Sequence, residues 1–458
     1  MTAPKASATG PTLAQRQAKW ISELEYEAIP VDVRERARLL LLDFLGVARR
    51  GATLPQVEPA RALLADLDTA PQATIIGGGG KAAAAYAAYA NGTYGHSCEY
   101  DDGHMDCGHA GVCVIPTVLA LAERKGSSGK DIIVAIVAGY QAMIYSMGPI
   151  NRVTLDIGWH GMKVGGVFGA AAGAAKILGL SELQIANALA IAGSDSSGTM
   201  EYDQSGGEVK RFHAGIATRS GLQAAVLAGA GLTGPLTIFE GLRGIHRLFS
   251  ERGTVDVERF WDGSWHIVNT FVKLYPMVGT VHAALDALGM VLDRNPAGAD
   301  DIAEIEVGLV DWAVPHGAAI VHPHDMLSAQ FSLAHACALR VIRGQVAIAD
   351  LADPVIRSDA QINAFAEKVK PVAIDVPDGA EQLFGQVTVR FTDGQTETVL
   401  QHAPRGHPKN PATGEDIKVK FREVVSGLLD EETVETFIAT IENLEQHENA
   451  SGLIAQLG

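Results

Sequence analysis

One stretch of the chain predicts its fold class: residues 164–178 read VGGVFGAAAGAAKIL. Lys176 is the only charged residue there, so a helix formed by this stretch is apolar on most of its faces. Such helices lie inside a helical assembly rather than on its surface. The glycines and alanines would let a neighbouring helix come close. We therefore expect a large bundle of tightly packed helices.

The helical pattern extends in both directions, from Leu13 to about Phe271. In residues 31–49 apolar side chains recur at helical spacing, and Gly51 follows as a stop signal. Ser181 and Gln184 fit a capping box ahead of an apolar helix. Three further segments are apolar enough for buried helices, namely 82–90, 114–122 and 132–147.

A different pattern begins after Phe271. Apolar and polar residues alternate over 304–309 and over 387–391, which is the period of a strand. The second run leads into Asp393-Gly394, a hairpin-turn dipeptide, and the alternation resumes over 396–400. Helical patterns lie among these strands, at 282–292 and 330–342. This part of the chain predicts a small α+β domain.

Together these patterns predict a mainly α protein, with a large all-helical domain and an inserted, smaller α+β lid domain. We place a disordered tail at 1–12, the helical domain at 13–270 plus 406–458, and the lid domain at 271–405. Helical patterns at 418–429 and 431–444 return the chain to the first domain. A cleft between two such domains is a common place for a ligand site.

Composition excludes several classes of protein. The 458 residues include 36 Lys+Arg and 53 Asp+Glu, a net charge of −17, and 47% are hydrophobic, which is typical of a globular protein. An acidic chain without a basic run is not expected to bind nucleic acid or an anionic membrane. Four cysteines make no disulfide framework, and residues 1–15 show no signal-peptide pattern, so we expect a cytoplasmic protein. The apolar run 132–150 contains polar residues and is interpreted as a core helix rather than a membrane span.

The densest polar cluster is the segment HSCEYDDGHMDCGH at residues 96–109, which lies between two apolar helical patterns. We favour an acid–base loop of an active site, because the pKa values of imidazoles and carboxylates can be tuned toward neutrality. A structural loop whose aspartates cap helices is the main alternative. A metal site is the other, but the cysteines at 98, 107 and 113 lack zinc-ribbon spacing and no H-E-x-x-H motif is present. We therefore expect no metal.

Four shorter motifs add candidates. His160 precedes the helix predicted at 164–178, where the helix dipole disfavours its charged form, so it could act as a base or simply cap the helix. Residues 209–215 (VKRFHAG) place two cations and a histidine before a helix predicted at 216–227. This segment is interpreted either as an anion-binding site at the helix N-terminus or as a solvated basic turn. Lys273, in the segment VKLYP at 272–276, stands where the pattern changes and could hold an anion. The glycines at 77–80 lack the spacing of a phosphate loop and predict a turn.

Taken together, these segments resemble the MmgE/PrpD family, which includes 2-methylcitrate dehydratase, cis-aconitate decarboxylase and iminodisuccinate epimerase. The resemblance runs from about Ile21 to Leu444. Its carriers are short motifs in a fixed order: YDDGH at 100–104 with HAG at 109–111, WH at 159–160, KRFHAG at 210–215, GP at 234–235 with EG at 240–241, KLYP at 273–276 with His282 and Asp286, GHPKNP at 406–411 and KFR at 420–422.

The resemblance implies a helical domain with an inserted α+β lid domain, a homodimer, no cofactor and an active site in the cleft between the domains. It implies a small di- or tricarboxylic acid as substrate. The residues that it marks as catalytic are His109, His160, Lys210, Lys273 and Glu99. Those expected to bind substrate are Asp102, Gly103, His104, Arg211, His213, Tyr275 and His282.

Three positions depart from the family pattern. Glu99 stands where members commonly have Asp, Gly103 stands where they have Thr, and the decarboxylase-type pattern has a His near Val278. The acid–base framework is kept, while groups expected to contact substrate differ.

The chemistry of such substrates requires cations to hold carboxylates and a group that moves a proton beside one. Lys210, Lys273 and Arg211 are the expected clamps, and His109 and His160 the acid–base pair. The same residues would serve dehydration, decarboxylation or epimerisation. We favour a hydro-lyase of the 2-methylcitrate dehydratase type, with a cis-aconitate-type decarboxylase and an iminodisuccinate-type epimerase as alternatives. A non-catalytic carboxylate-binding relative and a metal-dependent hydrolase also stay open.

Overall fold

The computed structural model describes residues 10–202, 207–250 and 255–457. The chain folds into two compact units. The first unit comprises residues up to Ser97, Asp101–Thr270 and the segment from Gly414 onward, and the second comprises Cys98–Tyr100 and Phe271–Thr413. The tail expected at 1–12 falls mostly on residues 1–9, which lie outside the described residues.

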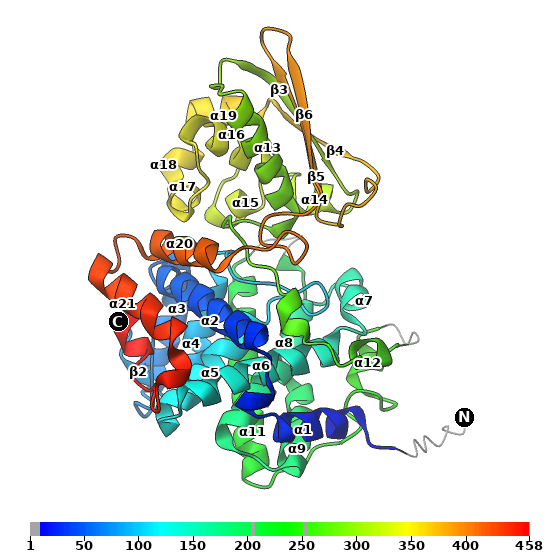
Figure 1. Cartoon of the computed structure of the whole chain (residues 1–458), viewed down its shortest axis with the longest axis vertical. Coiled ribbons are helices and arrows are strands. Elements are labelled where there is room, and N and C mark those ends of the chain that lie inside the picture. Colours follow the sequence, from blue (N-terminus) through cyan, green and yellow to red (C-terminus); the bar gives the residue numbers. More distant parts are fainter. Residues whose placement is uncertain (1–9, 203–206, 251–254, 458) are drawn as a thin grey trace. The chain divides into compact units, whose positions relative to one another are not determined.

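The first unit is a helical assembly (Figure 1). Its helices are α1 (Leu13–Glu23), α2 (Val31–Gly51), α3 (Glu58–Leu67), α4 (Ala84–His96), α5 (Gly111–Lys125), α6 (Gly129–Met147), α7 (Asn151–Asp156), α8 (Gly161–Leu178), α9 (Glu182–Ala192), α11 (Val209–Gly229), α12 (Ile245–Leu248), α20 (Gly414–Val425) and α21 (Glu431–Glu442).

The predicted Gly/Ala-rich helix is α8, and it packs against α5, α6, α9 and α11. The contact with α11 is close: a Cβ built on Gly221 would lie 2.5 Å from the Cβ of Ala170. The capping box of Ser181 and Gln184 at the start of α9 is confirmed. Because many of the side chains on α8 are small, the neighbouring helices pack close to its backbone.

The expectation of an all-helical domain is wrong in one detail. Two-residue strands β1 (Ala73–Thr74) and β2 (Lys81–Ala82) pair antiparallel, and the predicted glycine turn joins them. The residues ahead of α11 also differ from the prediction, because that helix begins at Val209 rather than 216. Lys210, Arg211 and His213 are therefore part of the helix and do not precede it.

The second unit is built on a four-stranded mixed sheet of strand order β4-β3-β5-β6. Strands β3 (Ile302–Leu309), β5 (Gly385–Phe391) and β6 (Thr396–Gln401) confirm the predicted alternation and hairpin. Strand β4 (Val369–Ala373), which the sequence analysis missed, pairs parallel to β3 and lies at an edge. Its pattern is interrupted by Pro371, a residue that sheets tolerate mainly in edge strands.

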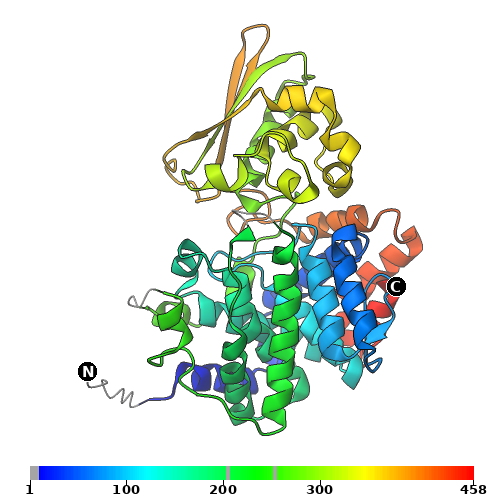
Figure 2. The same ribbon diagram turned by 180° about the vertical axis from the view of Figure 1, so that it is seen from behind.

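Helices cover one face of this sheet (Figures 1 and 2). They are α13 (His282–Arg294), α14 (Ala313–Gly317), α15 (Met326–Gln330), α16 (Leu333–Arg343), α17 (Ile348–Ala352), α18 (Pro354–Arg357) and α19 (Ala360–Ala366). Val387 and Val389 of β5 join the core beneath them, while Thr388 and Thr398 pair their hydroxyls at 2.9 Å on the other face. Helices α13 and α16 confirm the predicted helical segments.

The second unit does not end at residue 405 as expected. Arg405 N–H donates to Asp286 at 2.7 Å, and Val272 N–H donates to the carbonyl of Gly406 at 3.1 Å. These bonds hold the chain beyond 405 against the start of the second unit, which runs to Thr413. The role of this unit as a lid stays a prediction.

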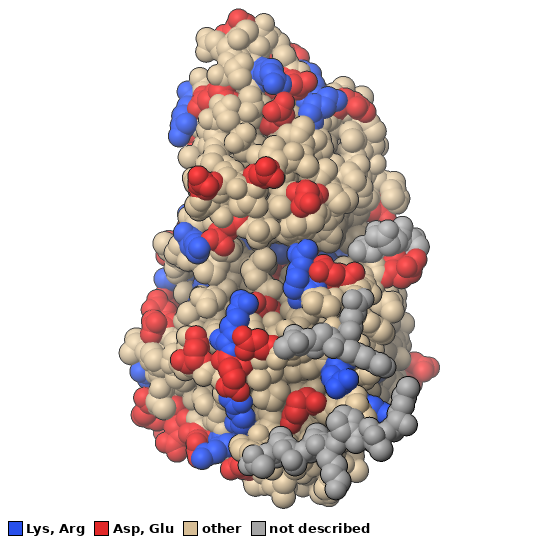
Figure 3. Space-filling view, turned by 90° about the vertical axis from the view of Figure 1, so that its right-hand side faces the viewer, with Lys and Arg blue, Asp and Glu red and all other residues tan. Residues whose placement is uncertain are grey.

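The described surface carries both signs of charge. Acidic and basic side chains are interspersed on the face drawn in Figure 3, without a large basic patch. None of the described helices is both long enough and apolar enough to cross a membrane. The apolar run at 132–150 forms the buried helix α6, as predicted.

Candidate active site

Four histidines of the first unit lie together at the ends of four helices. His96 is the last residue of α4, and His109 stands just before α5. His160 is the N-cap of α8, and His213 lies near the start of α11. Neighbouring ring centroids are 5.0 Å apart for His96 and His109, 6.1 Å for His96 and His160, and 5.2 Å for His160 and His213. We call these four rings the histidine cluster.

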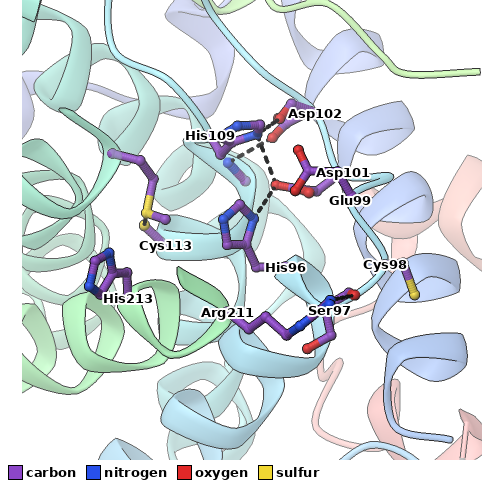
Figure 4. A network of polar contacts seen from close by, with 12 residues as sticks. His96, Ser97, Cys98, Glu99, Asp101, Asp102, His109, Cys113, Arg211 and His213 are labelled. Carbon is purple, nitrogen blue, oxygen red and sulfur yellow. Dashed lines mark hydrogen bonds and ion pairs between the residues drawn. The ribbon is translucent and has the colours of Figure 1, made fainter. Parts of the chain in front are cut away.

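Asp101 holds two of these rings through one oxygen. Its Oδ2 lies 3.0 Å from Nδ1 of His96 and 3.0 Å from Nδ1 of His109 (Figure 4). His109 Nδ1 also lies 2.7 Å from the carbonyl oxygen of Asp102. A carbonyl and an ionised carboxylate only accept hydrogen bonds, so both Nδ1 atoms must carry the hydrogen. In the neutral rings, Nε2 is therefore the atom with the free lone pair.

The charges agree with this assignment. Burial opposes ionisation of Asp101, but the imidazoles of His96 and His109 outweigh it and hold the pKa of that carboxyl well below its usual value. Burial lowers the pKa of His96, against the pull of Asp101. Within the described residues, neither His96 Nε2 nor Asp101 Oδ1 has a hydrogen-bond partner, although both are buried. The cluster thus offers a buried, neutral base beside a fixed negative charge.

His160 and His213 form the other half of the cluster. Their Nδ1 atoms lie 2.9 Å apart. The ring of Tyr202 makes T-shaped contacts with both, at centroid distances of 5.7 Å from His160 and 5.8 Å from His213. Burial lowers the pKa of His160 well below its usual value and that of His213 to about 4. The ammonium of Lys210, buried in the first turn of α11, acts in the same direction on both. His160 does not cap α8 with its side chain, so the simple capping interpretation is wrong.

Three residues expected to bind substrate support the loop instead. Asp102 Oδ1 accepts from Gly111 N–H at 3.1 Å, and its Oδ2 accepts from Tyr140 Oη at 2.5 Å. Arg211 donates to the Ser97 carbonyl and to the Glu208 carboxylate. His104, whose pKa burial lowers to about 4, accepts through Nδ1 from the N–H of Asp106 at 3.1 Å. Their contact with a substrate stays a prediction.

The second unit contains the buried ion pair of Lys273 and Glu99. Lys273 Nζ lies 2.8 Å from Glu99 Oε1 and 3.2 Å from the Glu99 carbonyl, and both side chains are at most 5% exposed. Glu99 has a φ of 52°, in the left-handed region that non-glycine residues rarely adopt. Gln330 donates to the Cys98 carbonyl at 2.8 Å, and Tyr100 Oη donates to the Leu274 carbonyl at 3.0 Å. These bonds maintain the strained backbone at Glu99.

The remaining predicted residues also lie in described parts of the chain. Tyr275 Oη donates to Asp286 Oδ1 at 3.0 Å, and its ring meets His282 at a centroid distance of 5.3 Å. His282 Nε2 lies 3.1 Å from the Met277 carbonyl. Gly103 is buried in the loop after Asp102. Their predicted substrate contacts are not tested by these bonds.

His96, Asp101 and His109 also offer the composition of a metal site, with ligand atoms within 4.8 Å of one another. Both Nδ1 atoms donate to oxygen acceptors, so a metal could bind these two histidines only through Nε2. The expected absence of a metal stays a prediction.

Some of these residues were predicted from the sequence as site residues, and others were not. His109, His160, Lys210 and His213 are joined in the first unit, and Glu99 and Lys273 in the second. His96 and Asp101 were quoted within the polar segment but not selected. The signal was their spacing: a histidine that ends an apolar helix, followed five residues later by an aspartate, lets the turn fold the carboxylate back onto the ring.

Comparison with known proteins now places the chain. The family model of the MmgE/PrpD N-terminal domain matches residues 15–258, and the family model of the MmgE/PrpD C-terminal domain matches residues 275–446. The chain belongs to the MmgE/PrpD family. Its relatives include the cis-aconitate decarboxylase-like protein oryM of Aspergillus oryzae, 28% identical over 95% of both chains. Cis-aconitate decarboxylases of Aspergillus terreus (28% identical, 96% of this chain and 94% of the relative) and Homo sapiens (26%, 93% and 90%) are also similar.

The predicted family is thus confirmed. The names of these relatives support an enzyme of the lyase class and favour the decarboxylase alternative over the hydro-lyase that the sequence analysis preferred.

Proposed function

We propose that this chain is a lyase that decarboxylates a small unsaturated tricarboxylic acid of the cis-aconitate type. The observation that carries the proposal is the contact between Asp101 and His109. It occurs in a chain whose relatives over most of its length are named cis-aconitate decarboxylase or cis-aconitate decarboxylase-like protein. The Asp101 carboxylate lies 3.0 Å from Nδ1 of His109, where it can balance a positive charge on that ring during catalysis. Lys210 lies near His96 and His160 as a cation for a substrate carboxylate.

The proposed step moves one proton. When the carbon–carbon bond to the leaving carboxylate breaks, its electron pair stays on the substrate carbon skeleton and carbon dioxide departs. The His109 imidazolium then gives its Nε2 proton to that carbanion, while its Nδ1–H remains on Asp101 and the Asp102 carbonyl. The ring ends neutral, with its lone pair on Nε2, and takes a proton from solvent before the next turnover.

Hydro-lyase activity is a second candidate, because the decarboxylase-type pattern has a His near Val278 and this chain does not. The departure at Gly103 is from the family as a whole and bears equally on both reactions. In the hydro-lyase reaction His109 and His160 would divide proton removal and protonation of the leaving hydroxyl.

The test is to incubate the purified chain with cis-aconitate and, separately, with a panel of hydroxy tricarboxylates, and to follow products by proton NMR. Carbon dioxide release with an unsaturated dicarboxylate product supports decarboxylation, whereas dehydration of a hydroxy acid supports the hydro-lyase. Binding without conversion favours a non-catalytic relative and contradicts both. His109→Gln should abolish turnover, and His324→Gln is the matched control because His324 is 84% exposed.

A further inference from the structure

The contact between His160 and His213 joins two nitrogens of the same kind. Nδ1 of His160 lies 2.9 Å from Nδ1 of His213, a hydrogen-bond distance, and both residues are buried. The rings approach from different helices, since His160 occupies the residue just before α8 and His213 stands on α11. Figure 4 shows His213 projecting from α11 on the side where His96 and His109 lie.

Two nitrogens at this distance need one hydrogen between them. Two bare lone pairs, or two N–H groups, would repel each other in a buried place. If the Nδ1 of His160 carries the hydrogen, its Nε2 is bare and the Nε2 of His213 is protonated. If His213 carries it, the assignments are reversed. In the neutral pair, the two rings must therefore hold opposite tautomers.

The surroundings keep both rings neutral. Lys210 and His96 stand near both, Lys163 acts on His213, and His109 acts on His160, all disfavouring added positive charge. The N-terminus of α8 disfavours charge on His160 as well. The carboxylate of Asp101 accepts from His96 and His109.

We propose that His213 is a positioning residue for His160: one hydrogen shared between their Nδ1 atoms couples the tautomers of the two rings. The exchange starts from two neutral rings, with the shared hydrogen on Nδ1 of His160 and another hydrogen on Nε2 of His213. His160 Nε2 accepts a proton, the shared hydrogen crosses to Nδ1 of His213, and His213 gives its Nε2 proton to a water molecule. Two ring N–H bonds form and two break, so both rings end neutral with exchanged tautomers and His160 Nε2 has changed from acceptor to donor.

Nitrogen-15 NMR of the histidine-labelled full chain tests the coupling without a substrate. A protonated and a bare ring nitrogen have separate resonances, and the His160→Asn and His213→Asn variants assign the two rings by the signals they remove. We expect one ring with a protonated Nδ1 and the other with a protonated Nε2 near neutral pH. Two rings with bare Nδ1 atoms, or two charged rings, would overturn the proposal.

A kinetic arm rests on the proposed function and uses cis-aconitate as the probe. His213→Phe removes the hydrogen bond and should lower kcat by about 100-fold with little change in KM. His213→Asn keeps a hydrogen-bond partner for Nδ1 but cannot take up the shared hydrogen, so it should not restore kcat. His246→Asn is the control, because His246 is a buried histidine of the same unit whose Nε2 meets the Ser146 carbonyl at 2.8 Å.

The two arms fail separately. Equal kcat for the folded His213→Phe variant and the unchanged protein would overturn the positioning role. If the unchanged protein turns over no carboxylate, the proposed function fails, and the NMR result still decides the tautomer coupling.

Discussion

Replacing Asp101 with Asn removes one charge and leaves the shape of the side chain nearly unchanged. In the present protein, Asp101 Oδ2 accepts from the Nδ1 atoms of both His96 and His109 at 3.0 Å. The amide has one oxygen and one NH2 group. If its oxygen stays on the rings, the NH2 group takes the place of Oδ1, which is buried and has no partner within the described residues. If the amide turns over, the NH2 group meets two ring N–H groups.

Both arrangements have a cost that can be estimated. Burying an amide without an acceptor costs about 1–3 kcal/mol of folding free energy. The turned arrangement would force at least one ring into the other tautomer, and a misplaced proton at a general acid typically lowers kcat by about 10²- to 10⁴-fold. For Asp101→Asn we expect losses of this size in both stability and turnover.

The assay combines urea denaturation with carbon dioxide release from cis-aconitate, expressed per folded molecule. Asp350→Asn is the matched control: Asp350 is equally buried, pairs with Arg343 at 2.8 Å in the second unit, and should lose stability while keeping kcat. A folded Asp101→Asn protein with kcat within about threefold of the unchanged protein would refute the reasoning, since proton placement by Asp101 would then contribute less than the range expected of acid–base catalysis.

Three further predictions concern stability and are measured by chemical denaturation. Lys273→Met removes the ammonium that lies 2.8 Å from the buried Glu99 carboxylate and should cost about 3–5 kcal/mol of folding free energy. The added change Glu99→Gln should restore part of that loss, and no restoration would contradict a paired role. Burial raises the pKa of Asp102 from 3.8 to about 6, so protonation of this carboxyl stabilises the folded state. This contribution to the free energy of unfolding is complete below about pH 4 and is lost as the pH rises through 6. This amounts to about 3 kcal/mol, and Asp102→Asn should remove that part of the pH dependence, whereas an unchanged profile would show that Asp102 is not the group. Gly221→Ala should cost about 1–3 kcal/mol because its Cβ would meet that of Ala170 at 2.5 Å, and a neutral result would mean that α8 and α11 separate easily.

The fold was predictable where a pattern repeats over many residues. The Gly/Ala stretch that forms α8 and the alternation that forms β3, β5 and β6 carry their own period, so the sequence indicated them directly. Strand β4 was missed because five residues interrupted by Pro371 have too little period to recognise. The end of the second unit was missed for another reason: it depends on the bond from Arg405 N–H to Asp286, which joins distant parts of the chain.

The site was predictable as a set of residue types but not as a set of contacts. Family resemblance selected His109 and His160, yet it did not distinguish Asp101, which holds two rings, from Asp102, which accepts from Gly111 and Tyr140. The side chains of adjacent loop residues can point in opposite directions. The backbone conformation of the loop determines which of the two aspartates faces the histidine rings.

The three residues Cys98–Tyr100 belong to the second unit, while the chain on both sides of them belongs to the first. This arrangement limits how the protein can be divided in evolution or in the laboratory. A fragment of residues 271–413 expressed alone would carry a buried Lys273 without its counter-charge, because Glu99 is encoded more than 170 positions upstream. Transfer of the second unit to another helical protein would need a host whose own loop supplies an acidic residue in a left-handed conformation. An engineered protein therefore keeps the second unit whole only when residues 98–100 accompany residues 271–413.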